Sequence, residues 1–232
     1  MPTRLAWTPS DTHAGPPLWL PALAFAVLFL AGLYFVTTFS GVPAFPGPWE
    51  SPTVIASFFK LRPGAAATCA ALQFGAAIPL GIYTATVASR YRFHGVAAAG
   101  PTIALFGGFA TAATMLIAAA VLWSMSFPGI AQSESVTQAL YRIQFALGGP
   151  GFSVPLGVLI LGIAVPGGLS RLLPRWLFWS GVILGVIGEL SWLDLLFPKT
   201  LLLIPLTRFP GFVWVILAGL WLPARRIERQ EG

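Results

Sequence analysis

The chain of 232 residues contains only 9% Asp, Glu, Lys and Arg, against 56% hydrophobic residues and a mean hydropathy of +0.82. A soluble domain contains about 25% of these charged residues, so this chain has too few charges to cover the surface of a soluble fold. The net charge of +6 comes from basic residues at the ends of apolar runs, and no nucleic-acid partner is expected. The composition predicts several membrane spans.

Six apolar runs follow one another along the chain, each near the roughly 20 residues that a helix needs to cross the hydrocarbon core. They lie at residues 18–39, 63–89, 101–123, 140–168, 173–196 and 203–222. The first run exceeds the roughly 7–15 residues of a signal-peptide core, so we interpret it as a retained helix, with a cleaved signal as the alternative. The runs predict an all-α fold, a polytopic bundle of about six transmembrane helices in one domain over residues 1–232.

A short amphipathic segment follows the first run. Residues 40–52 are rich in turn formers, and Val54, Ile55, Phe58 and Phe59 then recur at helical spacing, with Lys60 on the polar side. Residues 53–61 are too few to span a bilayer. They predict a short interfacial helix, and an ordered loop is the alternative.

The fourth run is the hardest to place. A continuous helix over residues 133–170 would be about 50 Å long at about 1.5 Å per residue, whereas the hydrocarbon core is about 30 Å thick. Gly148, Gly149, Pro150 and Gly151 lie in its middle, and proline removes a backbone donor and clashes with the preceding turn. We expect a kink or a break there. A broken helix can expose backbone groups to a substrate in transporters, but a kink that aids packing is commoner.

Small residues stand four apart in two of the runs. Ala71 precedes Gly75, and Ala104, Gly108 and Ala112 follow one another at the same spacing. Such residues let helix backbones approach closely in lipid. The same spacing also arises by chance in alanine-rich runs.

The orientation follows from the positive charges, because the connections of six crossing helices alternate between the two sides. One side would hold Arg4, Arg90, Arg92, Arg171, Arg175, Arg225, Arg226 and Arg229. The other would hold Lys60, Arg62, Arg142, Lys199 and Arg208. Eight charges against five predict that both termini are cytoplasmic. Abundant Ala, Gly and Pro, with more arginine than lysine, are typical of a GC-rich bacterium, so we expect the bacterial cell (inner) membrane.

The expected partner is the bilayer itself. Anionic lipid heads should contact the basic residues that end the apolar runs. These residues are Arg90, Arg92, Arg171, Arg175, Arg225 and Arg226. A protein partner and a small ligand both remain open.

Glu189 lies at membrane depth in the fifth run, where an ionisable residue is costly and is a functional candidate. It shares a helical face with Gly181 and Gly185, which predicts that it points into the bundle. A buried carboxylate needs a cationic partner or stays protonated. Arg208 is the nearest cation by depth and Arg142 is the second, so we expect a Glu189–Arg208 ion pair. The pair would either form part of a site or only fix the register of two helices.

Two amides complete the candidate intramembrane polar site. Gln73 in the second run and Gln144 in the fourth could hydrogen-bond across helices or line a polar cavity. Hydroxyl groups toward the same outer half belong to Tyr34, Thr37, Thr38, Tyr141 and Ser191. Most of them should bond their own backbone, but together they outline a pocket. Asp194 is expected to reach headgroup water instead.

Several catalytic classes are excluded by missing motifs. His13 and His94 both fall outside the runs, so no intramembrane histidine pair can hold haem, and the single cysteine, Cys69, cannot form a thiolate metal site. The chain has no His-Glu-x-x-His, Gly-x-Ser-x-Gly or phosphate-loop pattern. We expect no catalytic residue, no metal and no cofactor.

The second half resembles a known family in short pieces of sequence. These pieces are residues 152–160, residues 172–176, Gly188 with Glu189, and residues 212–219. They are similar to bacterial six-helix membrane proteins grouped as a 4386-like domain of unknown function. The resemblance covers mainly residues 140–222 and implies six helices in a bacterial cell membrane. It transfers no catalytic residue.

The functional expectation is a multi-pass bacterial membrane protein that is not an enzyme and has an accessory, structural or small-ligand-binding role. The alternative is a small-solute transporter or permease subunit, with Glu189, Arg208 and the helix break at its site. An intramembrane enzyme is the third hypothesis.

Overall fold

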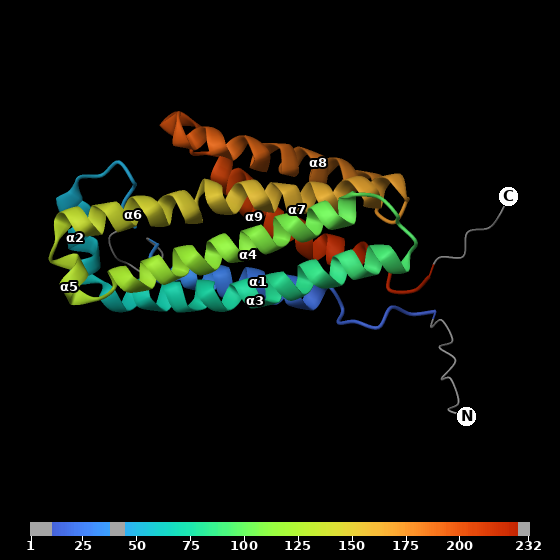
Figure 1. Cartoon of the computed structure of the whole chain (residues 1–232), viewed down its shortest axis with the longest axis horizontal. Helices are drawn as coiled ribbons and strands as arrows, with labels where there is room; N and C mark the ends of the chain where they lie inside the picture. The colour runs from blue at the N-terminus through green and yellow to red at the C-terminus, as the bar shows by residue number, and fades with distance from the viewer. Residues whose placement is uncertain (1–10, 38–44, 227–232) are drawn as a thin grey trace, which may run out of the picture.

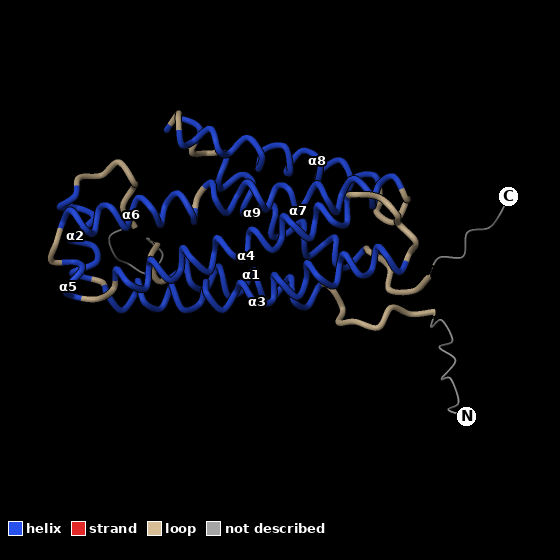
Figure 2. The backbone as a smooth tube through the Cα atoms, viewed as in Figure 1, coloured by secondary structure: helices blue, strands red, loops and turns tan. Residues whose placement is uncertain are grey.

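The computed structural model describes residues 11–37 and 45–226, which form helices joined by short connections (Figures 1 and 2). Their order is α1 (Trp19–Tyr34), α2 (Pro52–Leu61), α3 (Pro63–Phe93), α4 (Gly100–Met125), α5 (Pro128–Ala131), α6 (Glu134–Gly148), α7 (Pro150–Leu169), α8 (Arg175–Leu190), the 3-10 helices η2 (Ser191–Leu195) and η3 (Pro198–Thr200), and α9 (Leu203–Trp221). Within these ranges only an isolated bridge, Thr12 to Arg225, is strand-like. The predicted all-α helical bundle is confirmed.

Five helical segments are long and apolar enough to cross a membrane: Pro63–Phe93, Gly100–Met125, Glu134–Leu169, Arg175–Leu195 and Pro198–Trp221. The first predicted span, residues 18–39, contains a shorter helix, α1, of 16 residues, and residues 38 and 39 lie outside the described part. Figure 1 shows the long helices running along a common axis, with the segments before α1 and after α9 at one end and α2 and α5 at the other. With α1, these five segments give six passes along the bundle in the described part of the chain.

Several helix boundaries differ from the predicted spans. α3 continues to Phe93 and the fourth element begins at Glu134, because hydropathy marks the apolar part of a helix and not its polar ends. α8 ends at Leu190, earlier than residue 196, and η2 follows. At this point the Ser191 hydroxyl donates to the carbonyl oxygen of Gly188 over 2.6 Å, a side-chain bond that competes with the helical ladder. The short helix α5 was not predicted.

The predicted amphipathic helix is α2. The Ser51 hydroxyl caps it by accepting a hydrogen bond from the backbone N–H of Val54, and a serine at this position satisfies a donor that the first turn leaves free. α2 buries Ile55, Phe58 and Phe59 against the protein. The helix, and not the alternative of an ordered loop, is therefore what residues 53–61 form.

The fourth element is interrupted at Gly149. α6 ends at Gly148 and α7 begins at Pro150, and Gly149 between them has φ −90° and ψ −102°. Pro150 lacks the N–H that would continue the ladder of α6, and proline is well tolerated at the first position of α7. Figure 1 shows α7 following α6 along the bundle rather than turning back. The interruption expected within Gly148–Gly151 thus lies at one residue of a nearly continuous element.

Glycines let the central helices pack closely against one another. α4 packs between α3 and α7. A Cβ on Gly162 of α7 would lie within 3.0 Å of Ala104 on α4, and one on Gly108 of α4 would lie within 3.0 Å of Thr84 on α3. These contacts use the predicted Ala104–Gly108 spacing. Gly75 faces open space instead, so its spacing from Ala71 marks no helix contact.

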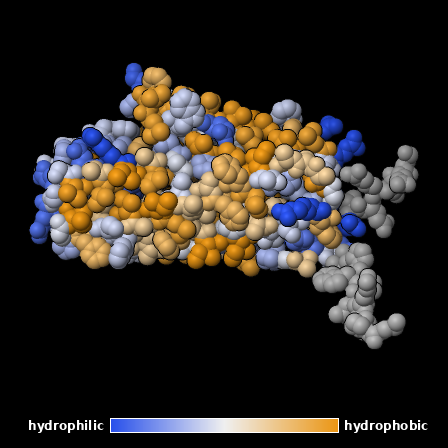
Figure 3. Space-filling model, viewed as in Figure 1, coloured by the Kyte–Doolittle hydropathy of each residue, from blue (hydrophilic) through white to orange (hydrophobic). Residues whose placement is uncertain are grey.

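The buried apolar residues form two clusters. The main core includes Phe25, Leu80, Ile160 and Val215 and joins α1, α3, α4, α7 and α9. The second cluster lies under α2, α5 and α6 and includes Phe59. Figure 3 shows hydrophobic residues along the length of the visible face and hydrophilic residues gathered toward the two ends, as a membrane-embedded bundle requires.

Backbone bonds join the two described ends of the chain. The His13 N–H donates to the carbonyl oxygen of Ala224 over 2.8 Å, and the Arg226 N–H donates to that of Asp11 over 2.9 Å. Arg90 is 3% exposed, and its guanidinium donates to the carbonyl oxygens of Leu222 and Pro16. Arg90 therefore fastens both end segments to α3 and is not free for lipid heads.

Candidate functional site

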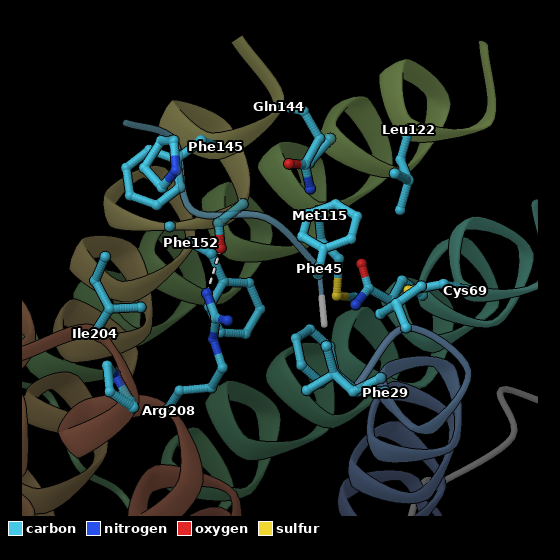
Figure 4. Close-up of a pocket in the computed structure, with 18 of the residues that line it drawn as sticks. Phe29, Phe45, Cys69, Met115, Leu122, Gln144, Phe145, Phe152, Ile204 and Arg208 are labelled. Carbon is cyan, nitrogen blue, oxygen red and sulfur yellow. Dashed lines mark hydrogen bonds between the residues drawn. The ribbon is translucent and has the colours of Figure 1, made fainter. Parts of the chain in front are cut away.

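A cavity of about 320 Å³ lies where the two apolar clusters meet. Its walls come from α1, α3, α4, α6, the start of α7, α9 and residues 45–48 (Figure 4). Most of the lining is apolar, with Phe29, Met115, Leu122, Phe152 and Ile204 among it. Small-molecule sites have this character, a largely apolar concavity of about 300–1,000 Å³ with a few polar groups.

Among the described lining residues, Arg208 is the one that carries a charge. It reaches from α9 to the end of α6, where Nη2 donates to the carbonyl oxygen of Gly148 (Figure 4). Its Cζ lies 4.9 Å from the ring centroid of Phe152 and 5.4 Å from that of Phe29. A cation at a helix C-terminus satisfies a carbonyl that has no helical partner and complements the helix dipole. Arg208 is thus the C-terminal cap of α6.

Several N–H donors of the Arg208 guanidinium have no hydrogen-bond acceptor in the described chain. Its Nε is buried without a hydrogen-bond partner. Within the described residues no bond to Nη1 is formed, and no carboxylate lies within ion-pairing distance of Arg208. The two aromatic rings compensate part of this charge through cation–π contacts. Arg208 therefore retains donors that a ligand could use.

Two amides share the cavity with Arg208. Gln73 of α3 is 9% exposed and Gln144 lies on α6. Neither side chain makes a hydrogen bond to another residue of the described chain. Figure 4 shows Gln144 and Arg208 directed into the pocket from opposite sides of the view. Three of the residues singled out in the sequence therefore converge on one cavity.

One wall of the pocket is held by aromatic packing. The Tyr141 hydroxyl on α6 donates to the carbonyl oxygen of Pro46. The ring of Phe45 lies 5.3 Å from that of Tyr141 and 5.2 Å from that of Phe58 on α2. Tyr141 and Thr37 line the pocket, as expected of the outer-half hydroxyl groups. Tyr34 is exposed, Ser191 bonds within its own turn, and Thr38 lies outside the described residues.

The expected Glu189–Arg208 ion pair is not formed. Arg208 points to the carbonyl of Gly148, while Glu189 lies outside the pocket lining and its Oε1 is buried without a partner. α8 and α9 are neighbours as predicted. The chain connection makes the two helices neighbours but does not determine the rotation of each helix about its axis, on which the ion pair depends. Arg142 is exposed and lines no part of the pocket.

Asp194 also differs from its expected place in headgroup water. It is 5% exposed, and both of its carboxylate oxygens are buried without a hydrogen-bond partner. η2 packs against α7 and so folds this residue inward. The Ser153 hydroxyl on α7 is likewise buried and unpaired. These polar atoms lie outside the lining of the pocket.

The break contributes Gly148 and Gly149 to the lining, but Pro150 and Gly151 do not line it. No signal in the sequence pointed to the aromatic pair around Arg208, because Phe29, Phe152 and Arg208 are far apart in the chain and have no common spacing. In the described ranges no three His, Cys, Asp or Glu side chains gather as metal ligands would.

Comparison of the chain with protein-family models, with curated proteins and with solved structures gives no match.

Proposed function

We propose that the chain is a multi-pass membrane protein that binds a small ligand in the pocket between its two apolar clusters. The observation that carries this proposal is the convergence of Arg208, Gln73 and Gln144 on one largely apolar cavity. Polar side chains at membrane depth are costly, and they mark functional sites when they face a shared cavity. The proposal retains the expected non-enzymatic role. The described lining residues are mostly apolar side chains, with two amides and one guanidinium among them.

Transport of the same ligand is the second candidate. Gly148 and Gly149 place the interruption between α6 and α7 on the wall of the pocket, and transporters use such interrupted helices at their substrate sites. Proteoliposome flux that is abolished by filling the cavity would favour transport. Binding without flux would favour a binding protein.

The proposed setting is the inner membrane of a bacterium, with both ends of the chain cytoplasmic. The excess of arginine at the connections on that side supports this orientation. Arg92, Arg171, Arg175, Arg225 and Arg226 are exposed and would contact anionic lipid heads.

The proposal is tested by filling the cavity. Ala118 of α4 is buried in the lining, whereas Ala113 on the same helix is exposed. Protein purified in a neutral detergent is examined by native mass spectrometry for a bound small molecule. We expect the wild type and Ala113→Leu to carry it and Ala118→Leu to lose it while remaining folded. An identical bound mass in folded Ala118→Leu, or none in any of the three proteins, would contradict the proposal.

A further inference from the structure

We propose that the ligand is a medium-chain amphiphile with an anionic head, which binds at Arg208 while its chain lies along the apolar walls. This inference rests on the proposed function, since it names the ligand class for the same pocket. Three observations carry it: the charge of the polar end, the free donors around it, and the size and lining of the remaining space.

The polar end of the pocket is positive. Arg208 has five N–H donors, of which the structure uses one, on the carbonyl oxygen of Gly148. Its Nε is buried without a partner. A charge removed from water needs an ionic or fully hydrogen-bonded environment, and the described chain supplies no carboxylate to Arg208. An anionic head would complete this environment.

The groups around Arg208 favour an acceptor. Gln73 and Gln144 each bring an amide whose NH₂ group has no protein partner in the described chain. Gly149, also in the lining, immediately precedes the first residue of α7, so the positive end of that helix dipole lies at the pocket wall. Arg208 meanwhile occupies the negative end of α6. The opposed dipole ends of α6 and α7 therefore meet at Gly149, and the free donors of Arg208 and the two amides are what favour an acceptor.

The rest of the pocket suits an alkyl chain. Phe29, Leu33, Val36, Met115, Leu122 and Ile204 form its apolar walls. The volume of about 320 Å³ lies at the lower end of small-molecule sites. This space fits a single chain of medium length and not a complete two-chain lipid.

The test compares ten-carbon probes that differ in the head, together with acetate, which has the carboxylate head but no chain. Binding of radiolabelled decanoate to the full chain in maltoside detergent is measured in competition with unlabelled decanoate, decyl phosphate, decanol and acetate. We expect decanol to bind at least about tenfold more weakly than decanoate, because a charge-assisted hydrogen bond is lost. Acetate should not compete. Equal competition by decanoate and decyl phosphate would show that the site accepts both head chemistries, and a difference would identify the preferred head.

Matched variants locate the head. Arg208→Gln should reduce decanoate affinity to that of decanol, whereas Arg175→Gln, at an exposed arginine, should not. Arg208 also caps α6, so Gln73→Leu gives a second variant that leaves this cap in place. Gln73→Leu should weaken decanoate several-fold and leave decanol unchanged, and Gln132→Leu, at an exposed glutamine, serves as its control.

The outcomes separate the two proposals. If decanoate and decanol bind equally and folded Ala118→Leu blocks both, the pocket binds ligands but the anionic head is wrong. If folded Ala118→Leu blocks neither, the proposed site and the ligand class both fail.

Discussion

Gly162 has no side chain at the point where α7 packs against α4. A Cβ there would lie within 3.0 Å of the backbone of Ala104, and backbone atoms cannot move aside as the end of a flexible side chain can. A Cβ on Gly107 would likewise approach the backbone of Leu159. The absence of a Cβ at these two glycines thus determines how closely α4 and α7 pack.

We predict that Gly162→Ala lowers the free energy of unfolding by about 1–3 kcal/mol, the range for overpacking a well-packed interior. Gly75→Ala is the matched control, because a Cβ on Gly75 would have no neighbouring atom within 4 Å. The control should be neutral or stabilising by up to about 1 kcal/mol through helix propensity. Thermal and denaturant unfolding in detergent measure the free energy of unfolding of both variants. Equal stability of the two variants would mean that the α4–α7 contact has no such constraint.

At the scale of elements, α6 is held at three places. Its end is capped by Arg208, its middle is bonded to Pro46 through Tyr141, and Thr53 of α2 donates to Glu134 at its start over 3.2 Å. α6 and α2 thereby cover one end of the bundle, and the pocket lies beneath them.

Tyr141→Phe should weaken the attachment of α6 to residues 45–49. The variant removes the donor to the buried carbonyl oxygen of Pro46, and an unsatisfied buried carbonyl costs about 1–3 kcal/mol. Hydrogen exchange should rise in residues 45–49 and 134–148 more than in α3 or α4. Tyr34→Phe, at an exposed tyrosine, should change nothing. A uniform rise over the whole chain would argue against a local role for this bond.

Much of this element pattern could be predicted from the sequence. Apolar runs identify the long helices because lipid forces every backbone group to bond within its segment, and the Gly148–Gly151 composition places the interruption. Gln73, Gln144 and Arg208 stand out as polar residues in apolar runs. That they line one cavity could not be predicted, because helix rotation depends on contacts between distant residues. The spacing of Ala104 and Gly108 predicts a close contact but does not identify Gly162 as the partner. The expected place of Asp194 is wrong for a related reason, since a 3-10 segment turns it inward.

At the scale of the whole molecule, the six passes place successive connections at alternate ends. Figure 1 shows the α3–α4 connection near the described chain ends and the α8–α9 connection toward the other end. If both chain ends are cytoplasmic, a membrane-impermeant maleimide on intact cells should label Lys199→Cys and not Ala98→Cys, each in a Cys69→Ala background. Labelling of Ala98→Cys alone would reverse the orientation, and labelling of both would contradict the crossings between them.

The pairing of residues 11–13 with residues 224–226 should depend on pH through His13. Burial lowers the pKa of His13 below its ordinary value, and the charges of Arg90 and His94 lower it further. The paired state therefore favours neutral His13, whose Nε2 lies 3.0 Å from the Ser89 hydroxyl. Pairing should be strongest above the ordinary histidine pKa of about 6.5 and weaken as the pH falls below it.

Hydrogen-exchange protection of residues 11–15 and 222–226, corrected for intrinsic rates, measures this effect. His13→Asn should reduce the pH dependence of this protection. A protection that increases on acidification in the wild type would contradict a lowered pKa of His13 in the paired state.

The bridge from Thr12 to Arg225 brings the two ends of the described chain together. The connectivity of the chain could then be cut elsewhere without loss of packing, because fold stability depends on contacts and not on where the ends lie. A permutant that links residue 226 to residue 11 and begins at residue 98, in the exposed α3–α4 connection, would keep every helix and the same number of crossings. Its new ends would lie at the same end of the bundle as the old ones. A permutant that keeps the wild-type melting temperature would show that the order in which the helices are synthesised is not needed to assemble them.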